Sequence, residues 1–428
     1  MLDQGGAQGK CYGGSISFEL LSSSPAATAR RLPREVAFWA VAVTLGFLLF
    51  ASSAPSPLYV VYQHEWRFSP LTLTSVFAVY VLALLVALVF AGSLSDRVGR
   101  RPVLLAALSV ELAAMVLFGV AHGVGMLFVA RIVQGFATGV ATGALSATLI
   151  DLQPPSRPHL GALLSAATPP LGLAGGALGS GLLVQYAPDP LRLVYWLLTA
   201  VFALALLVVL ALPETVRATH GWRSAVRPRI GVPGQARAAF VAVAPVLIAT
   251  WALGGLYLSL GPSLAVSLLH TSSHLTGGLV IVALNVPGAI AAILSRDAHP
   301  ERVLIGGAAL LALGVGITLL GLNTEATGLF FAGSVVAGVG FGAGFSGAFK
   351  TVISLSPPTE RAGLIAAVYV LSYLGFSLPA VAAGIAVTHA GLLPTTNVYG
   401  SVVAALALVA MGLTLAERIR ARVEPGGR

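Results

Sequence analysis

Charged residues are scarce in this sequence. Aspartate, glutamate, lysine and arginine make up 9% of its 428 residues, whereas hydrophobic residues make up 57% and the mean hydropathy is +0.91. Soluble domains carry roughly 25% charged residues, so this chain has too few to cover a water-facing surface. The scarcity excludes a soluble globular protein. Long apolar runs between short polar hinges instead indicate an all-α integral membrane protein.

Other features that would support enzyme chemistry are also missing. Cys11 is the single cysteine, which excludes an internal disulfide and a cysteine-bound metal cluster. The sequence contains no phosphate-binding G-x-x-x-x-G-K-[ST] motif, so an ATP-driven pump is not expected. The histidines fall at the ends of apolar runs or in loops, without the spacing of a metal site or a catalytic triad. These absences predict no enzyme, no cofactor and no metal.

Twelve apolar segments are long enough to cross a bilayer. A helix rises about 1.5 Å per residue, so crossing about 30 Å of hydrocarbon needs roughly 20 apolar residues. The predicted spans are residues 36–62, 71–94, 103–121, 124–150, 159–186, 191–212, 238–269, 276–294, 303–322, 328–355, 362–388 and 396–416.

The arginine and lysine residues predict how the chain is oriented. Of 24 such residues, Arg67 and Arg192 fall in or beside loops on one side of the membrane, and Arg131 falls within a span. The remaining 24 − 3 = 21 lie on or near the opposite side of the membrane. Basic loops favour the cytoplasm, so both chain ends are predicted to be cytoplasmic. The formal net charge of +9 therefore reflects membrane orientation, and no nucleic-acid partner is expected.

Polar stretches divide the chain into two sets of six spans. Residues 213–237 form the longest internal polar stretch and are rich in arginine. Residues 1–35 lack an apolar core of signal-peptide length and are predicted to be a disordered tail, although a start codon assigned too far upstream fits equally well. The predicted units are the cytoplasmic tail 1–35, the N-terminal six-helix bundle 36–212, the cytoplasmic linker 213–237, the C-terminal six-helix bundle 238–416 and the cytoplasmic tail 417–428.

The two halves repeat each other. A shift of 203 residues lays DLQPPS (Asp151–Ser156) over SLSPPT (Ser354–Thr359). The same shift pairs Gly125 with Gly328, Gly135 with Gly338 and Gly139 with Gly342. Internal repeats of membrane transporters bracket a central site that opens to either side in turn. The repeat therefore favours a transporter.

The most specific motif lies between the second and third spans. The stretch GSLSDRVGRR (Gly92–Arg101) follows the pattern G-x-L-x-D-R-x-G-R-R and resembles the loop signature of the major facilitator superfamily. The resemblance implies 12 transmembrane helices in two pseudo-symmetric six-helix bundles. The gating residues that it implies are Gly92, Asp96, Arg97, Gly99, Arg100, Arg101 and Asp151.

The resemblance also implies a conformational role for this loop. Asp96 is expected beside the N-terminal end of the eleventh span, near Arg361, where unpaired N–H groups favour a carboxylate. Arg100 is expected to pair with both Asp96 and Asp151. Such contacts would join the halves on the cytoplasmic side and hold the outward-facing state.

A charge inside the fourth span marks a candidate coupling site. The stretch RIVQGFATGVATG (Arg131–Gly143) resembles the fourth-helix motif of the same family, whose arginine is implicated in proton coupling. Arg131 and Gln134 share a helix face, and an intramembrane charge is usually functional; the alternative for Arg131 is a residue that snorkels to the interface. Glu111 is the only acidic residue deep within a span. It is either a proton carrier or a neutral acid packed against a neighbouring helix.

Interrupted spans point to a central cavity. The fifth span resembles the glycine-rich antiporter motif of the family, but Ser180 stands where that motif would be completed, which weakens the inference of antiport. Other spans contain prolines near polar and aromatic residues, and such broken helices often border a transport site. The candidate cavity residues are Ser53, Tyr59, Trp251, Tyr257, Asn285, Tyr369 and Tyr373.

The favoured function is secondary transport, with protons as the coupling ion and a small molecule as substrate. A cavity poor in fixed charge and amides favours export of small amphipathic compounds in exchange for protons. Proton-coupled uptake of a small metabolite or sugar is the alternative, and a receptor or scaffold without transport is a remote one. The 22 arginines against 2 lysines indicate a GC-rich bacterial source. The protein is therefore expected in the lipid bilayer of the bacterial plasma (inner) membrane. It is also expected to be a monomer.

Overall fold

The computed structural model describes residues 31–216, 230–268, 273–357 and 359–423, which are helical and contain no β-strand. The first half comprises α1 (Arg34–Ser53), α2 (Pro55–Trp66), α3 (Pro70–Ala91), α4 (Ser95–Val98), α5 (Arg100–Gly119), α6 (Val124–Leu152), α7 (Leu160–Tyr186) and α8 (Pro190–Leu210). The second half comprises η1 (Gly234–Ala236), α10 (Arg237–Ser259), α11 (Gly261–Leu268), α12 (His274–Leu294), α13 (Pro300–Asn323), α14 (Thr327–Ser354), α15 (Arg361–Ala390) and α16 (Leu392–Val423).

Within these described residues, 12 helical segments are long and apolar enough to cross a membrane, which confirms the predicted number of spans. The ends differ from prediction by several residues. The last helix differs most, because it begins at Leu392 and continues to Val423. Pro394 fits inside it because it lies in the first turn, where a proline removes no helical hydrogen bond.

Two spans consist of two helices each. The first is broken at Ala54, between α1 and α2, and the seventh at Leu260, between α10 and α11. Pro55 and Pro262 stand at the start of the helices that follow the two breaks. Proline lacks an N–H group and clashes with the preceding turn, so each proline ends one helix and begins another. Both breaks fall within candidate spans that the sequence singled out.

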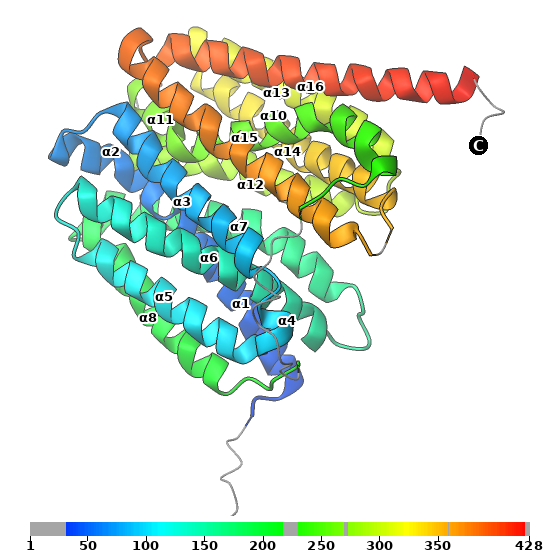
Figure 1. The fold of residues 1–428 in the computed structure, drawn as a ribbon. Helices are drawn as coiled ribbons and strands as arrows, with labels where there is room; N and C mark the ends of the chain where they lie inside the picture. The colour runs from blue at the N-terminus through cyan, green and yellow to red at the C-terminus, as the bar shows by residue number, and fades with distance from the viewer. Residues whose placement is uncertain (1–30, 217–229, 269–272, 358, 424–428) are drawn as a thin grey trace, which may run out of the picture.

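The helices form two bundles with separate cores. Figure 1 shows α1–α8 on one side of the molecule and α10–α16 on the other. One buried core is drawn mainly from α1–α8 and a second from α10–α16. Residues 230–236 lead into the second bundle, where the N–H of Gly231 donates to the carbonyl of Gly363 at 3.2 Å. The arrangement is the pair of pseudo-symmetric six-helix bundles that the sequence predicts.

The glycines of the sequence repeat have the same packing role in both halves. A Cβ atom on Gly139 would collide with the backbone oxygen of Leu84 in α3, and one on Gly342 would collide with that of Gly288 in α12. Only glycine lets the two backbones approach this closely. Helices α6 and α14 are therefore held against equivalent neighbours, α3 and α12.

The halves meet most closely at one end of the molecule. We call the end that carries α4 the motif end, and the opposite end, which carries α2 and α11, the far end (Figure 1). Near the far end, Gly384 of α15 touches Thr74 of α3, and Gly278 of α12 touches Ala177 of α7. Deeper in, the rings of Phe77 and Phe376 lie 5.2 Å apart. These contacts close the far end.

Candidate functional site

The charged loop at the motif end is organised around Arg100. Its guanidinium donates to Asp96, to the hydroxyl of Ser95 at 2.7 Å and to Oδ2 of Asp151 at 3.0 Å. Gly99 has a φ of 108°, a left-handed backbone conformation that glycine adopts without strain, and it reverses the chain between α4 and α5. Arg100 thus forms the two ion pairs that the sequence suggested.

Glu214, which the sequence analysis did not select, completes this loop. It is the second residue after Leu212 and accepts hydrogen bonds from the N–H groups of Arg100 at 2.9 Å and Arg101 at 3.0 Å. These N–H groups lie at the start of α5 and have no helical partner, so a carboxylate there is favourable. An acidic residue at the start of a linker gives little indication of a functional role. Nothing in the sequence predicts that Glu214 lies beside the start of a helix 114 positions earlier.

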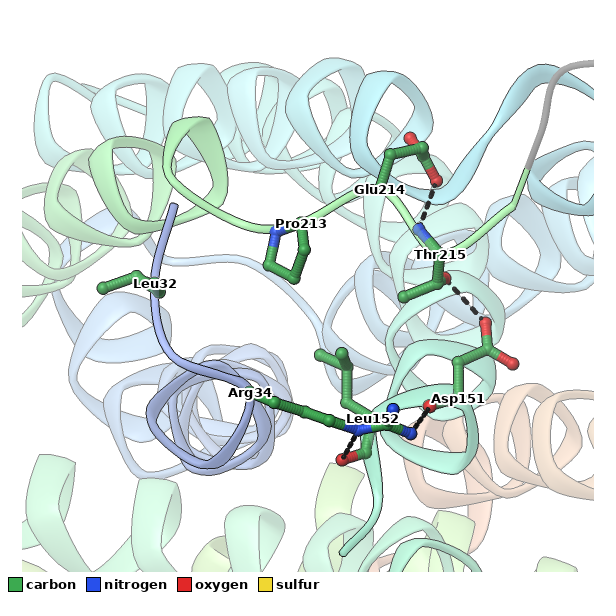
Figure 2. Close-up of a pocket in the computed structure, with 7 residues that line it drawn as sticks. All are labelled: Leu32, Arg34, Asp151, Leu152, Pro213, Glu214 and Thr215. Atoms are coloured by element: carbon green, nitrogen blue, oxygen red, sulfur yellow. Dashed lines mark hydrogen bonds between the residues drawn. The ribbon is translucent and has the colours of Figure 1, made fainter. Parts of the chain in front are cut away.

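The linker also binds the end of α6. Thr215 donates to Oδ2 of Asp151 at 2.9 Å, and Arg34 donates to the carbonyl of Leu152 at 3.3 Å (Figure 2). With Glu214 these residues surround a cavity of about 500 Å³ at the motif end. The side chain of Arg101 reaches the carbonyl of Leu210, at the end of α8. The loop, α6 and α8 are therefore joined within the first half.

Asp96 is not joined to the second half in this conformation by any described contact. Its side chain is 57% exposed, and its partner among the described residues is Arg100. The sequence placed Asp96 beside the start of α15, at Arg361. The difference follows from the closed far end: when the halves meet there, the loop need not hold them together at the motif end. The contact of Asp96 with the start of α15 stays a prediction for the conformation in which the motif end is closed. The gating roles of Gly92 and Arg97 also stay predictions.

The second group of predicted residues is buried inside the first half. Arg131 is 0% exposed. Its Nε donates to Tyr59 Oη at 2.6 Å, and its Nη1 donates to Gln134 Oε1 at 2.7 Å and to the carbonyl of Ser52 at 3.0 Å. The rings of Tyr59, Tyr80 and Phe118 lie 5.4, 5.0 and 5.6 Å from the guanidinium carbon. Arg131 is thus a buried residue and does not snorkel to the surface.

Glu111 belongs to the same network. It is 0% exposed, and its carboxylate accepts hydrogen bonds from Gln134 Nε2 and from Thr138 Oγ1, each at 3.3 Å. Gln134 therefore lies between Glu111 and Arg131. Among the described residues, Glu111 is the only acidic residue in the buried class. The third span brings it into the bundle interior, and not to the lipid-facing side.

The network is attached to the break in the first span. Because Pro55 has no N–H, the carbonyl of Ala51, four residues earlier, loses its helical partner. Gln134 Nε2 donates to that carbonyl at 3.0 Å. Arg131 binds the next carbonyl, that of Ser52, and also Tyr59 beyond the break. The two polar residues of α6 therefore connect α1 with α2.

The equivalent place in the second half has no charge. The shift of 203 residues pairs Arg131 with Ser334, Gln134 with Ala337 and Glu111 with Gly314. The correspondence is also spatial, because a Cβ atom on Gly314 would collide with the backbone nitrogen of Ala337. Ser334 pairs with Tyr257 at 2.7 Å.

The second half instead contains a cluster of aromatic rings. We call Trp251, Phe345, Tyr369, Tyr373 and Phe376 the aromatic cluster. The rings of the other four lie 4.6–6.3 Å from that of Trp251, so the cluster joins α10, α14 and α15. Tyr373 and Phe376 also pack against a buried cluster that contains Phe77 and Tyr80 of α3. The cluster therefore lies where the halves meet.

The remaining candidate cavity residues are enclosed in this conformation. Ser53 donates to the carbonyl of Leu173 at 2.7 Å. The side-chain amide of Asn285 donates to the carbonyl of Ile281 at 2.9 Å. Tyr257 is 2% exposed and is paired with Ser334. Trp251, Tyr369 and Tyr373 differ because each is only half-buried. The described residues hold no group of three or more His, Cys, Asp or Glu side chains that could bind a metal ion.

Within the described residues, twelve candidate spans form two pseudo-symmetric bundles, with a charged loop at one end and a buried network of Glu111, Gln134 and Arg131 in one bundle. This architecture is that of a polytopic membrane transporter. The sequence model of the Major Facilitator Superfamily matches residues 41–298, which are 258 of the 428 residues. The chain belongs to the Major Facilitator Superfamily.

Individual relatives are more distant. The multidrug resistance protein MdtL of Klebsiella pneumoniae subsp. pneumoniae is 26% identical over 309 residues, which are 68% of this chain and 74% of that protein. The uncharacterized MFS-type transporter Rv1250 of Mycobacterium tuberculosis is 31% identical over 147 residues, which span 33% of this chain and 25% of that protein.

Two solved structures have a similar fold. A mutant of the nucleoside transporter NupG has a TM-score of 0.65 and 16% identity, and the match covers 88% of this chain and 99% of that chain. The human organic anion transporter MFSD10 has a TM-score of 0.61 and 16% identity, with 90% and 100% covered. At this identity the likeness concerns the fold alone.

Proposed function

We propose that this protein exports small amphipathic compounds in exchange for protons, by alternating access. The observation that carries the proposal is the buried network of Glu111, Gln134 and Arg131. A carboxylate in a dry interior takes up a proton more readily than it keeps an unpaired charge. Since Arg131 cannot release its proton, Glu111 is the group that titrates.

The aromatic cluster supports the amphipathic substrate. Its half-buried rings offer large apolar faces, and no charged side chain belongs to it. Such rings bind apolar and aromatic compounds, and they attract cations through the ring faces. The match to the relative named as a multidrug resistance protein covers most of both chains. This similarity adds to the proposal.

Uptake of a metabolite or sugar is the second candidate function. Polyhydroxylated substrates need several convergent amides, because hydrogen bonds select for hydroxyl groups. The two amides deep within described spans, Gln134 and Asn285, are both bonded inside the protein. This favours export over sugar uptake.

The proposal includes an orientation. The excess of basic residues, which includes the arginines of the motif end, supports a cytoplasmic position for the motif end. The closed far end then faces outward, so this conformation faces inward. We place the protein in the bacterial inner membrane as a monomer with both termini cytoplasmic.

Transport in inverted membrane vesicles tests the function. A panel of fluorescent amphipathic dyes and a panel of labelled sugars and nucleosides are added with an imposed proton gradient, with and without an uncoupler. We expect dye accumulation that the uncoupler abolishes, and no accumulation in vesicles that carry Glu111→Gln. Gradient-dependent transport in the Glu111→Gln variant would contradict proton exchange at Glu111. Gradient-driven release of labelled sugars or nucleosides from preloaded vesicles would instead select uptake.

A further inference from the structure

Gln134 has hydrogen-bond partners that fix how its amide is oriented. Arginine only donates, so the amide oxygen must face Arg131. The amide nitrogen then faces Glu111 and the carbonyl of Ala51, which both accept. This arrangement suits an ionised Glu111. The bond from Gln134 to Glu111 is strongest when Glu111 is ionised.

What the network holds is the far-end half of the first span. Arg131 and Gln134 bind the carbonyls of Ser52 and Ala51 on one side of the break and Tyr59 on the other. Helix α2, which carries Tyr59, contacts α11 and α12 of the second half. The hold of Arg131 on the break therefore fixes a helix that takes part in closing the far end.

Building on proton coupling at Glu111, we propose that Gln134 is a positioning residue that converts the charge of Glu111 into the hold of Arg131 on the broken first span. This hold locks the empty transporter with its far end closed. An exchanger needs such a lock, because a carrier that crosses empty would let the proton gradient dissipate without export.

The charge of the network explains the release. With Glu111 ionised, its charge and that of Arg131 cancel. When Glu111 gains a proton, the bond from Gln134 loses its charge assistance, and Arg131 becomes an uncompensated buried cation. Its Nη2 atom already has no hydrogen-bond partner. Hydration of the guanidinium relieves this cost, and it requires the far end to open.

The other groups that face the network are neutral phenols. Tyr59 belongs to α2 and Tyr80 to α3, and both rings lie against the guanidinium of Arg131. Tyr195 of α8 stacks on Phe118, with the two ring centroids 4.8 Å apart. Tyr80 also supplies a second route to the lock, because it packs on Arg131 and belongs to the buried cluster that Tyr373 and Phe376 contact. A substrate among those rings would reach Arg131 through Tyr80.

The lock is tested by the accessibility of a buried thiol. Thr74 is 0% exposed and lies against Gly384 of the other half, so Thr74→Cys in a Cys11→Ser background reacts only when the far end opens. Labelling rates in nanodiscs are measured at acidic and neutral pH and divided by those of His64→Cys, an exposed site on α2. We expect acid to accelerate labelling roughly tenfold, a typical coupling between two sites.

Two substitutions of Gln134 should abolish the pH response in opposite directions. Gln134→Leu cannot accept from Arg131, so labelling should be fast at both pH values. Gln134→Glu accepts from Arg131 whatever the state of Glu111, so labelling should be slow at both. Thr414→Val, which removes a buried hydroxyl from α16, is the control and should respond as the wild type does.

The outcomes separate this lock from the proposed function. A wild-type pH response in Gln134→Leu and Gln134→Glu, with a flat response in Glu111→Gln, would overturn the lock and leave proton exchange intact. If Gln134→Leu does not yield folded protein, Gln134→Glu decides alone: an intact acid response overturns the lock. Transport that remains gradient-dependent in Glu111→Gln would instead remove the proposed function.

Discussion

The two halves share a backbone plan but differ in chemistry. In the first half, α5 and α6 are separated by Glu111, Gln134 and Thr138, which bond to one another. In the second half, α13 and α14 approach so closely that Gly314 touches the backbone of Ala337. One half therefore contains a buried polar network and the other contains a cluster of aromatic rings. Under the proposed function, the first half carries out ion coupling and the second half binds the substrate.

The largest effect is expected at the position where the halves differ most. Arg131→Ala should abolish gradient-driven transport, because the lock and the counter-charge of Glu111 are both lost. Ser334→Ala, at the equivalent position of the second half, should transport nearly as the wild type does, since only the hydroxyl pair with Tyr257 is lost. Dye transport in inverted vesicles measures both. Equal losses in the two variants would break the comparison.

The aromatic cluster should set affinity and not coupling. Trp251→Ala removes the ring that the other four contact, and we expect roughly tenfold weaker dye binding with the pH dependence of transport unchanged. Trp196→Ala, a tryptophan that is 44% exposed on α8, is the control and should leave affinity unchanged. Binding is measured by fluorescence quenching. A changed pH dependence with unchanged affinity in Trp251→Ala would reverse the assignment.

The shared plan predicts similar losses of stability in the two halves. Alanine at Gly139 or at Gly342 would push a Cβ atom into a neighbouring backbone oxygen, which should cost about 1–3 kcal/mol of stability in each case. Gly316→Ala is the control, because a Cβ atom there meets nothing within 4 Å. Thermal unfolding in detergent measures the three. A normal melting temperature for one of the two glycine variants would show that the halves are packed differently.

The smallest effect is expected at the motif end. Asp96→Asn removes one ion pair of Arg100 but leaves the bond to Asp151, so folding should be unchanged. An exposed pair contributes roughly 0–1 kcal/mol, so the transport rate should fall by up to about fivefold. Asp297→Asn, which removes the exposed pair with Arg296, serves as the control. A transport rate equal to the wild type would remove the gating role of Asp96.

Sequence and structure contributed different parts of the site. The lengths of the apolar runs and the Gly92–Arg101 motif were sufficient for the fold, since membrane spans are recognised by composition and length alone. Arg131 stood out because a charge inside a span is unusual. Glu214 did not stand out, because its partners are N–H groups of a distant helix, and backbone groups leave no trace in a sequence.

By itself, the sequence determined the number of spans, the duplication and the identity of the charged residues. Each of these depends on local composition, because a segment crosses the bilayer when its apolar run is long enough to span the hydrocarbon core. Only the tertiary structure decided that Gln134 joins Glu111 to Arg131, that both carbonyls at the Pro55 break are bound from α6, and that the far end is the closed one. The physical reason is that hydrogen bonds and inter-half contacts depend on how helices pack, and packing brings together residues that no local pattern relates.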